Sequence, residues 1–241
     1  MAEITSPESD KFTAALVLLH GLWDQPAGWR RFAGYLAHRG WRCIALARSA
    51  QLDTLEAVEA EVRDAIAALD APPILVGHDV GANVALRCVD RSRAVVALAP
   101  LVGPPLAEPS IVLQGAGTWL ERWRGDRLHA PRVGYPSRQS TEPAALVHTV
   151  TASAARPIPA SDVPRVVFAM EVDEVTPLAA TRRFAEQCGA PLQVIGGAGH
   201  AALAGAGWEA CVAAAHRWII RELGVDLLAL YDEAWEGREK P

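Results

Sequence analysis

Three residues have the chemistry of a nucleophile, its base and an acid that orients the base: Asp79, His200 and Asp173. Asp79 lies at the centre of Gly-His-Asp-Val-Gly, between an apolar run and a helical pattern. A sharp strand-to-helix turn of this kind is a nucleophile elbow, which holds its central side chain above the sheet. Gly77 and Gly81 lack a Cβ, so the strand and the helix can approach each other closely. Because a helix N-terminus stabilises an anion, the pattern favours a carboxylate nucleophile at Asp79.

A structural role is the alternative for Asp79, since aspartate is among the preferred N-cap residues of helices. The two other residues bear on this choice: Asp173 follows an apolar run at 165–170, and His200 follows the next run at 192–195. The carboxyl ends of parallel strands meet at the edge of the sheet where ligands bind. Taken singly, Asp173 could be an ordinary loop or capping carboxylate, and His200 a surface histidine in a glycine turn. All three, however, lie at the ends of predicted strands and follow one another in the order nucleophile, acid, histidine. This combination predicts a catalytic triad.

The segment His20-Gly21-Leu22-Trp23 supplies a fourth element. A strand that ends in His-Gly and turns sharply can present the Leu22 N–H to the elbow, where it forms an oxyanion hole with the Val80 N–H. We expect His20 to brace this turn and to take no part in catalysis. Trp23 is a candidate for the substrate pocket, although an aromatic residue after a strand is more often part of the core.

These residues need a scaffold that brings strand ends together, and the hydrophobic pattern predicts one. Apolar runs bounded by turn signals alternate with helical patterns, which is typical of an α/β fold whose mostly parallel sheet has helices on both faces. Strands are predicted at residues 12–20, 41–48, 73–78, 94–99, 165–170 and 192–195. Helices are predicted at residues 28–39, 54–69, 81–91, 177–188 and 208–223.

The alternation stops in the stretch 100–164, which is rich in Pro, Gly and Ala. An insertion of this size in a regular pattern is usually functional, and we interpret it as a cap over the site at about 101–163. Trp119 and Trp123, four residues apart, and Tyr135 are candidates for contacts with the substrate. Packing of the cap on the body is the alternative for the two tryptophans. Short helices are predicted at 110–123 and 142–154.

The segment 225–235 has apolar residues at helical spacing, which predicts a last helix. We expect this helix to pack on the body of the protein. A contact in a homodimer is the alternative.

The composition is that of a single globular domain spanning residues 1–241. Of these residues 51% are hydrophobic and 21% are charged, and a chain of this length can bury a full core. The net charge is −5 without a basic stripe, which argues against nucleic acids and membranes as partners. The N-terminus lacks a signal pattern, and no apolar run has transmembrane length. We therefore expect a cytoplasmic protein whose four scattered cysteines are free, buried thiols.

The motifs above, with the Glu171-Val172-Asp173 turn and the Gly199-His200 loop, resemble the α/β-hydrolase superfamily from residue 12 to about 223. Nucleophile, acid and histidine follow one another in the order of this superfamily. An elbow with a central Asp and a preceding His is similar to that of the epoxide hydrolases, haloalkane dehalogenases and fluoroacetate dehalogenases. The resemblance implies that the nucleophile is Asp79, the base His200, its orienting acid Asp173, and the oxyanion donors Leu22 and Val80.

Some residues depart from the patterns of these subfamilies. Val80 stands where haloalkane dehalogenases usually have a Trp that holds halide, and Leu22 stands where they often have Asn. Trp23 replaces a Pro that is common in epoxide hydrolases, and Tyr135 is the single tyrosine of a cap where those enzymes use several. Because the halide-binding side chains are missing and Tyr135 can donate a proton, we favour an epoxide by a narrow margin over a halide.

The resemblance implies two-step covalent hydrolysis of a small apolar organic substrate, without a cofactor or a metal. Asp79 attacks an sp³ carbon, and His200 activates the water that hydrolyses the alkyl ester. Acyl transfer suits a carboxylate poorly, because the acyl intermediate is a reactive anhydride. Several alternatives stay open: an esterase-like branch whose serine became aspartate, a lyase, cyclase or oxygenase in which Asp79 is not the nucleophile, and a non-catalytic ligand-binding protein.

Overall fold

The computed structural model describes residues 2–102, 127–129, 141–153 and 156–236 of the chain. Within these residues, seven strands form one sheet in the order β1-β3-β2-β4-β5-β8-β9. Every neighbouring pair is parallel except β1 and β3. The strands are β1 (Glu3–Thr5), β2 (Leu16–Leu19), β3 (Cys43–Leu46), β4 (Ile74–His78), β5 (Ala94–Leu98), β8 (Arg165–Met170) and β9 (Leu192–Ile195).

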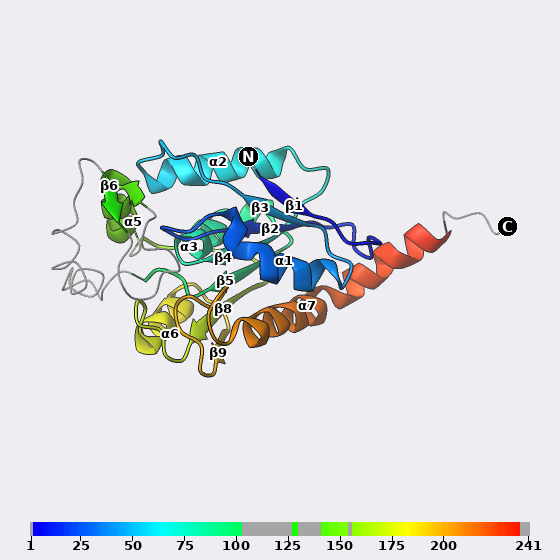
Figure 1. The fold of residues 1–241 in the computed structure, drawn as a ribbon. Coiled ribbons are helices and arrows are strands. Elements are labelled where there is room, and N and C mark those ends of the chain that lie inside the picture. Colours follow the sequence, from blue (N-terminus) through cyan, green and yellow to red (C-terminus); the bar gives the residue numbers. More distant parts are fainter. Residues whose placement is uncertain (1, 103–126, 130–140, 154–155, 237–241) are drawn as a thin grey trace.

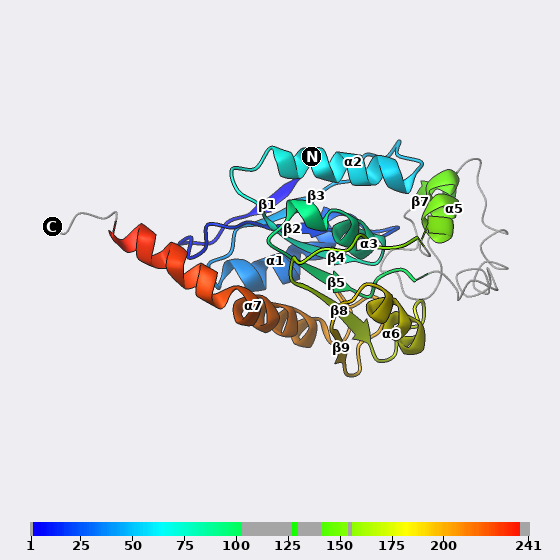
Figure 2. The ribbon, with the colours of Figure 1, turned by 180° about the vertical axis from the view of Figure 1, so that it is seen from behind.

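Helices cover both faces of this sheet, as the alternating pattern predicts (Figures 1 and 2). One face carries α2, α3 and α6, which pack on side chains such as Leu75 and Val95; the other carries α1 and α7, which pack on Val76 and Val96. Successive residues of a strand point to opposite faces of the sheet. Because helices cover both faces, the central strands are apolar almost throughout, and β4 and β5 are fully buried. The helices are α1 (Arg30–Ala37), α2 (Leu55–Ala67), α3 (Val80–Arg87), α6 (Leu178–Gln187) and α7 (Trp208–Glu236), with the 3₁₀ turns η1 (Pro26–Trp29) and η2 (Val89–Arg91).

Part of the predicted cap lies between β5 and β8. β6 (Arg127–His129) and β7 (Thr141–Pro143) form an antiparallel ribbon, and α5 (Ala144–Ser153) follows it. The helix α5 confirms the one predicted at 142–154, and its buried residues pack against the same core cluster as α2 and α3. The helix predicted at 110–123, which contains Trp119 and Trp123, lies outside the described residues, as does Tyr135.

Two parts of the backbone differ from the prediction. The strand β1 is not predicted, since Glu-Ile-Thr is short, mixes polar and apolar residues, and pairs only with β3 at the edge of the sheet. At the other end of the chain, α7 continues without a break from Trp208 to Glu236. Its last turns extend beyond the sheet layers in both views (Figures 1 and 2). The helix predicted at 225–235 is thus confirmed as a continuation of α7 and is not a separate element. Its packing on the body stays a prediction.

The cysteines are free and buried, as predicted: Cys43, Cys88, Cys188 and Cys211. Among the described helices, none is both long and apolar enough to cross a membrane. The same part of the chain holds no group of three or more His, Cys, Asp or Glu side chains that could bind a metal ion.

Candidate active site

The turn after β4 holds Asp79 in an unusual backbone conformation, with φ 54° and ψ −124°. Such a conformation costs about 1–3 kcal/mol in a residue with a Cβ and persists only where the surroundings impose it. A Cβ on Gly77 would lie 2.1 Å from the Gly81 carbonyl oxygen, and one on Gly81 would lie 2.2 Å from the Leu19 carbonyl oxygen. Both glycines of the motif are therefore required by the close approach of β4, α3 and β2.

The Asp79 side chain makes no capping hydrogen bond to α3. Its Oδ2 atom accepts a hydrogen bond of 2.9 Å from the Leu22 N–H. Its Oδ1 atom lies 3.8 Å from Nε2 of His200. The carboxylate thus faces the turn after β2 and the histidine loop, so the N-cap alternative considered from the sequence is wrong.

His200 and Asp173 meet beside this carboxylate. Nδ1 of His200 lies 3.1 Å from Oδ1 and 3.0 Å from Oδ2 of Asp173. Asp173 Oδ1 also accepts hydrogen bonds from the N–H groups of Val175, at 2.8 Å, and Thr176, at 2.7 Å. A carboxylate held in this way keeps the proton on Nδ1 and leaves Nε2 to face Asp79. The structure therefore brings together the three residues predicted as a triad, from the loops after β4, β8 and β9.

The turn after β2 carries the first of the two predicted oxyanion donors. A Cβ on Gly21 would lie 2.7 Å from both Cβ and Oδ2 of Asp79, so only glycine lets the turn pass this close. Leu22 follows with its N–H on Asp79, and Trp23 has a φ of 53°. The second predicted donor, Val80, is the first residue of α3, and its N–H makes no hydrogen bond to Asp79.

Burial dominates the electrostatics of this site, because Asp79 and His200 are both 0% exposed. Burial raises the pKa of Asp79 to about 6, against the opposing effects of His200 and the Leu22 N–H. Burial disfavours the imidazolium form of His200, but the hydrogen bond and charge of Asp173, with the charge of Asp79, outweigh it and raise the pKa. Asp79 is therefore an ionised, poorly solvated carboxylate at neutral pH.

Two further histidines hold the site in place. Burial lowers the pKa of His78 and of His20 to about 3, so both are neutral. Nε2 of His78 donates to the His200 carbonyl oxygen over 2.7 Å and thereby fixes the loop that carries the base. Nδ1 of His20 donates to the Gly21 carbonyl oxygen over 2.9 Å, so His20 braces the turn as predicted.

The sequence does not single out two charged residues beside this turn. Arg48 follows β3 and forms a nearly buried ion pair with Glu142 of β7. Glu142 Oε1 also accepts the Trp23 N–H over 2.9 Å. No motif marks these contacts, since the ion pair joins residues 94 positions apart. The Trp23 side chain is buried in the core cluster shared by β2 and α3, which is the alternative considered for it above.

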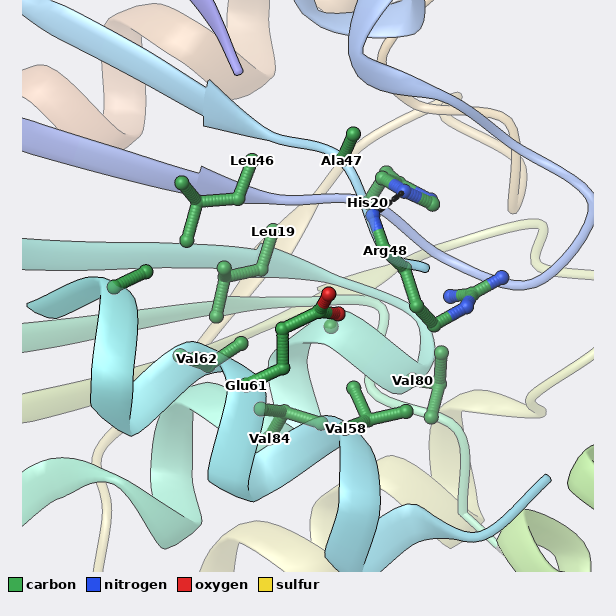
Figure 3. A pocket seen from close by; sticks show the side chains of 12 residues that line it. Leu19, His20, Leu46, Ala47, Arg48, Val58, Glu61, Val62, Val80 and Val84 are labelled. Atoms are coloured by element: carbon green, nitrogen blue, oxygen red, sulfur yellow. Dashed lines mark hydrogen bonds between the residues drawn. The ribbon is translucent and has the colours of Figure 1, made fainter. Parts of the chain in front are cut away.

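A small cavity of about 60 Å³ lies behind the elbow, between α2 and the ends of β2 and β3 (Figure 3). Its mostly apolar wall includes Val80 of the elbow and Val58 of α2, and its charged residues are Arg48 and Glu61. Glu61 accepts a hydrogen bond of 3.1 Å from the Ser49 N–H. This volume has room for a few water molecules but not for an organic substrate.

Solved structures with the same fold cover nearly the whole chain. The monoacylglycerol lipase of Paleococcus ferrophilus is 20% identical, with a TM-score of 0.70, and the match covers 92% of this chain and 99% of that one. A thermophilic esterase from Thermogutta terrifontis is 18% identical, with a TM-score of 0.67 and coverage of 92% and 93%. Est1E from Butyrivibrio proteoclasticus is 15% identical, with a TM-score of 0.64 and coverage of 93% and 95%. At these identities the likeness establishes the fold alone.

A family model described as "Alpha/beta hydrolase family" matches residues 16–214. No curated protein sequence matches the chain significantly. The family model spans β2 to α7 and includes the elbow, the acid and the histidine. The predicted fold is thereby confirmed, and the chain belongs to the α/β hydrolase family.

Proposed function

We propose that the protein is a hydrolase that attacks an electrophilic sp³ carbon of a small apolar substrate and forms an alkyl ester on Asp79. The orientation of this carboxylate carries the proposal: Oδ2 accepts the Leu22 N–H, and Oδ1 faces His200. One oxygen is thus held where an oxyanion will develop, and the other is available as the nucleophile. Oδ1 accepts no hydrogen bond from the described residues, so its attack on a substrate breaks no hydrogen bond to them.

In the first step, Asp79 Oδ1 forms a bond to the substrate carbon, and a halide leaves or the C–O bond of an epoxide opens. This step needs no base, because a carboxylate with a pKa of about 6 is ionised at neutral pH. An opened epoxide also needs a proton on its oxygen, and Tyr135 is the candidate donor in the cap. Val80 and Leu22 replace the halide-binding residues of haloalkane dehalogenases, so we favour the epoxide.

Alkylation also prepares the base for the second step. The charge of Asp79 is one of the influences that raise the pKa of His200. Because the ester is neutral, the pKa of His200 falls when the intermediate forms, and neutral imidazole becomes available to accept a proton.

In the second step, His200 takes a proton from water, and the water oxygen attacks Cγ of Asp79. Negative charge develops on Oδ2, where the Leu22 N–H stabilises it by roughly 3 kcal/mol. We propose the Val80 N–H as the second donor. The ester C–O bond then breaks, and the alcohol leaves with the proton that His200 took from the water. The second water proton is released from the Asp79 carboxyl group, to the deprotonated Tyr135 after opening of an epoxide or to solvent after displacement of a halide, and the Asp79 carboxylate is restored.

Ester hydrolysis is the second candidate, because two of the structural neighbours are described as a monoacylglycerol lipase and a thermophilic esterase. Attack of Asp79 on a carboxylic ester would give an anhydride, which is more reactive than the ester from which it forms. An esterase of this kind would therefore use Asp79 in another way, as a general base or an electrostatic group. The two functions differ in whether the Asp79 carboxylate exchanges an oxygen atom.

Single-turnover reactions in H₂¹⁸O separate these functions. Excess enzyme is mixed with styrene oxide, 1-bromobutane or a butyrate ester, and the peptide that contains Asp79 is analysed by mass spectrometry. We expect ¹⁸O in Asp79, unlabelled oxygen in the alcohol of the first turnover, and an alkyl adduct on Asp79 that accumulates in His200→Gln. Labelled product with unlabelled Asp79 would overturn the covalent mechanism, and turnover of the butyrate ester alone would assign an esterase.

A further inference from the structure

Two peptide planes of the turn after β2 are held by charged side chains that come from elsewhere in the chain. The Gly21 carbonyl and the Leu22 N–H belong to one planar peptide unit and point in opposite directions. Arg48 Nη1 donates to this carbonyl oxygen over 3.4 Å, and His20 Nδ1 donates to it over 2.9 Å. With the carbonyl end held, the N–H end is aimed at Asp79 Oδ2, 2.9 Å away.

The next peptide unit is held by the cap. Its N–H belongs to Trp23 and donates over 2.9 Å to Oε1 of Glu142, which lies in β7. Trp23 has a φ of 53°, a conformation that a bulky residue adopts only where its neighbours impose it. Glu142 is therefore positioned to hold the turn in the shape that presents the Leu22 N–H.

The two holding groups are joined to each other. The Nη2 atom of Arg48 forms an ion pair with the same Oε1 of Glu142, and both side chains are 9% exposed. A nearly buried ion pair contributes little to stability, because desolvation of the two charges offsets their attraction. Such a pair is better explained by the geometry that it imposes on the turn and on β7.

We propose that Arg48 and Glu142 are positioning residues of the oxyanion hole, which hold the Leu22 N–H towards Asp79 and link its position to the base of the cap. This inference rests on the proposed function, because the oxyanion forms on Asp79 during hydrolysis of the alkyl ester. Displacement of the Leu22 N–H slows that second step more than the first, since charge develops on Oδ2 only in the second.

The test separates the two steps by rapid quench of single turnovers. Arg48→Lys keeps a positive charge but loses the fork that reaches both Gly21 and Glu142. Glu142→Gln keeps an acceptor for Trp23 and loses the ion pair. In each variant we expect ester hydrolysis to slow by roughly tenfold to a hundredfold, with a several-fold smaller effect on alkylation, so that the Asp79 ester accumulates.

Two additional variants control for stability. Arg30→Lys alters an exposed ion pair with Glu3, whose side chains are 73% and 43% exposed, and should leave both steps unchanged. If Arg48→Lys does not fold, Arg48→Met combined with Glu142→Leu removes both charges and leaves neither buried alone. This double variant should show the same slow hydrolysis.

The outcomes distinguish the inference from the function on which it rests. Labelled Asp79 in the wild type, with both steps unchanged or slowed equally in the folded variants, overturns the positioning role alone. An Asp79 that never acquires ¹⁸O in the wild type overturns both. Selective slowing of ester hydrolysis supports the inference, because a general loss of folded enzyme would reduce both steps together.

Discussion

Replacement of Asp79 by Asn should stabilise the folded protein while it abolishes turnover. The two side chains have the same shape, and the amide oxygen of Asn can accept the Leu22 N–H as Oδ2 does. The substitution therefore removes a charge and little else. Because Asp79 is 0% exposed, that charge has lost its hydration in the folded state, and its removal relieves the fold of this cost.

The size of the effect follows from the pKa of Asp79. Burial raises this pKa from 3.8 to about 6, and at about 1.4 kcal/mol per pKa unit the ionised carboxylate costs the folded protein about 3 kcal/mol at pH 8. A carboxyl group with a higher pKa in the folded protein binds its proton more tightly there. Proton binding by Asp79 therefore stabilises the folded protein relative to the unfolded chain at low pH. This stabilisation is lost as pH rises through the pKa of Asp79 in the folded protein. Asp79→Asn should thus match the wild type near pH 4 and exceed it at pH 8.

Urea unfolding at pH 4, 6 and 8 measures this difference directly. At pH 8 we expect the variant to be about 3 kcal/mol more stable, or roughly 6–12 °C higher in Tm for a chain of this size. Asp64→Asn, on an exposed position of α2, serves as the matched control and should change stability by no more than about 0.5 kcal/mol. Equal stability of Asp79→Asn and wild type at pH 8, or a gain that is the same at every pH, would refute a buried ionised carboxylate.

Three other predictions concern the chemical steps. Alkylation in single turnovers should accelerate as pH rises through about 6, because only ionised Asp79 attacks; quench-flow measurements from pH 5 to 8 test this, and a flat profile contradicts it. Gly21→Ala should slow both steps by roughly a hundredfold or more, since its Cβ would lie 2.7 Å from Asp79 Oδ2. Wild-type kinetics in a folded variant would contradict the close approach of this turn to Asp79. Asp173→Asn should slow hydrolysis of the ester by about 10⁴-fold, because it disturbs the tautomer of His200, and the Asp79 adduct should accumulate and be visible by mass spectrometry. An adduct that disappears as fast as in the wild type argues against Asp173 as the residue that orients His200.

The strands that carry the site are predictable because each has a local signal. β8 and β9 begin and end at the predicted residues, since an apolar run in each stops at a turn rich in glycine or acidic residues. Parallel strands end at one edge of the sheet, so Asp173 and His200 could be placed near Asp79 from their order alone. The strand β1 lacks such a signal and is defined by its pairing with β3.

The contacts that orient these residues could not be predicted from local patterns. The Arg48–Glu142 pair depends on where β7 returns to the turn after β2, which no periodicity encodes. The hydrogen bond from His78 to the His200 carbonyl oxygen joins residues 122 positions apart. The choice between a helix N-cap and a nucleophile for Asp79 likewise depends on the Leu22 N–H, which only the folded turn brings within 2.9 Å of its carboxylate.

The burial of Asp79 links the stability of the protein to its proposed chemistry. A carboxylate that has lost its hydration is a stronger nucleophile than one in water, and alkylation neutralises it. Part of the roughly 3 kcal/mol that its charge costs the fold is therefore released in the first step. Hydrolysis must regenerate the buried anion, so the second step is the more demanding one.

The groups around Asp79 assist this second step, because the Leu22 N–H and His200 both act on the ester and not on the incoming substrate. We therefore expect hydrolysis of the ester to limit turnover, and the alkyl-enzyme to be the dominant species at saturating substrate.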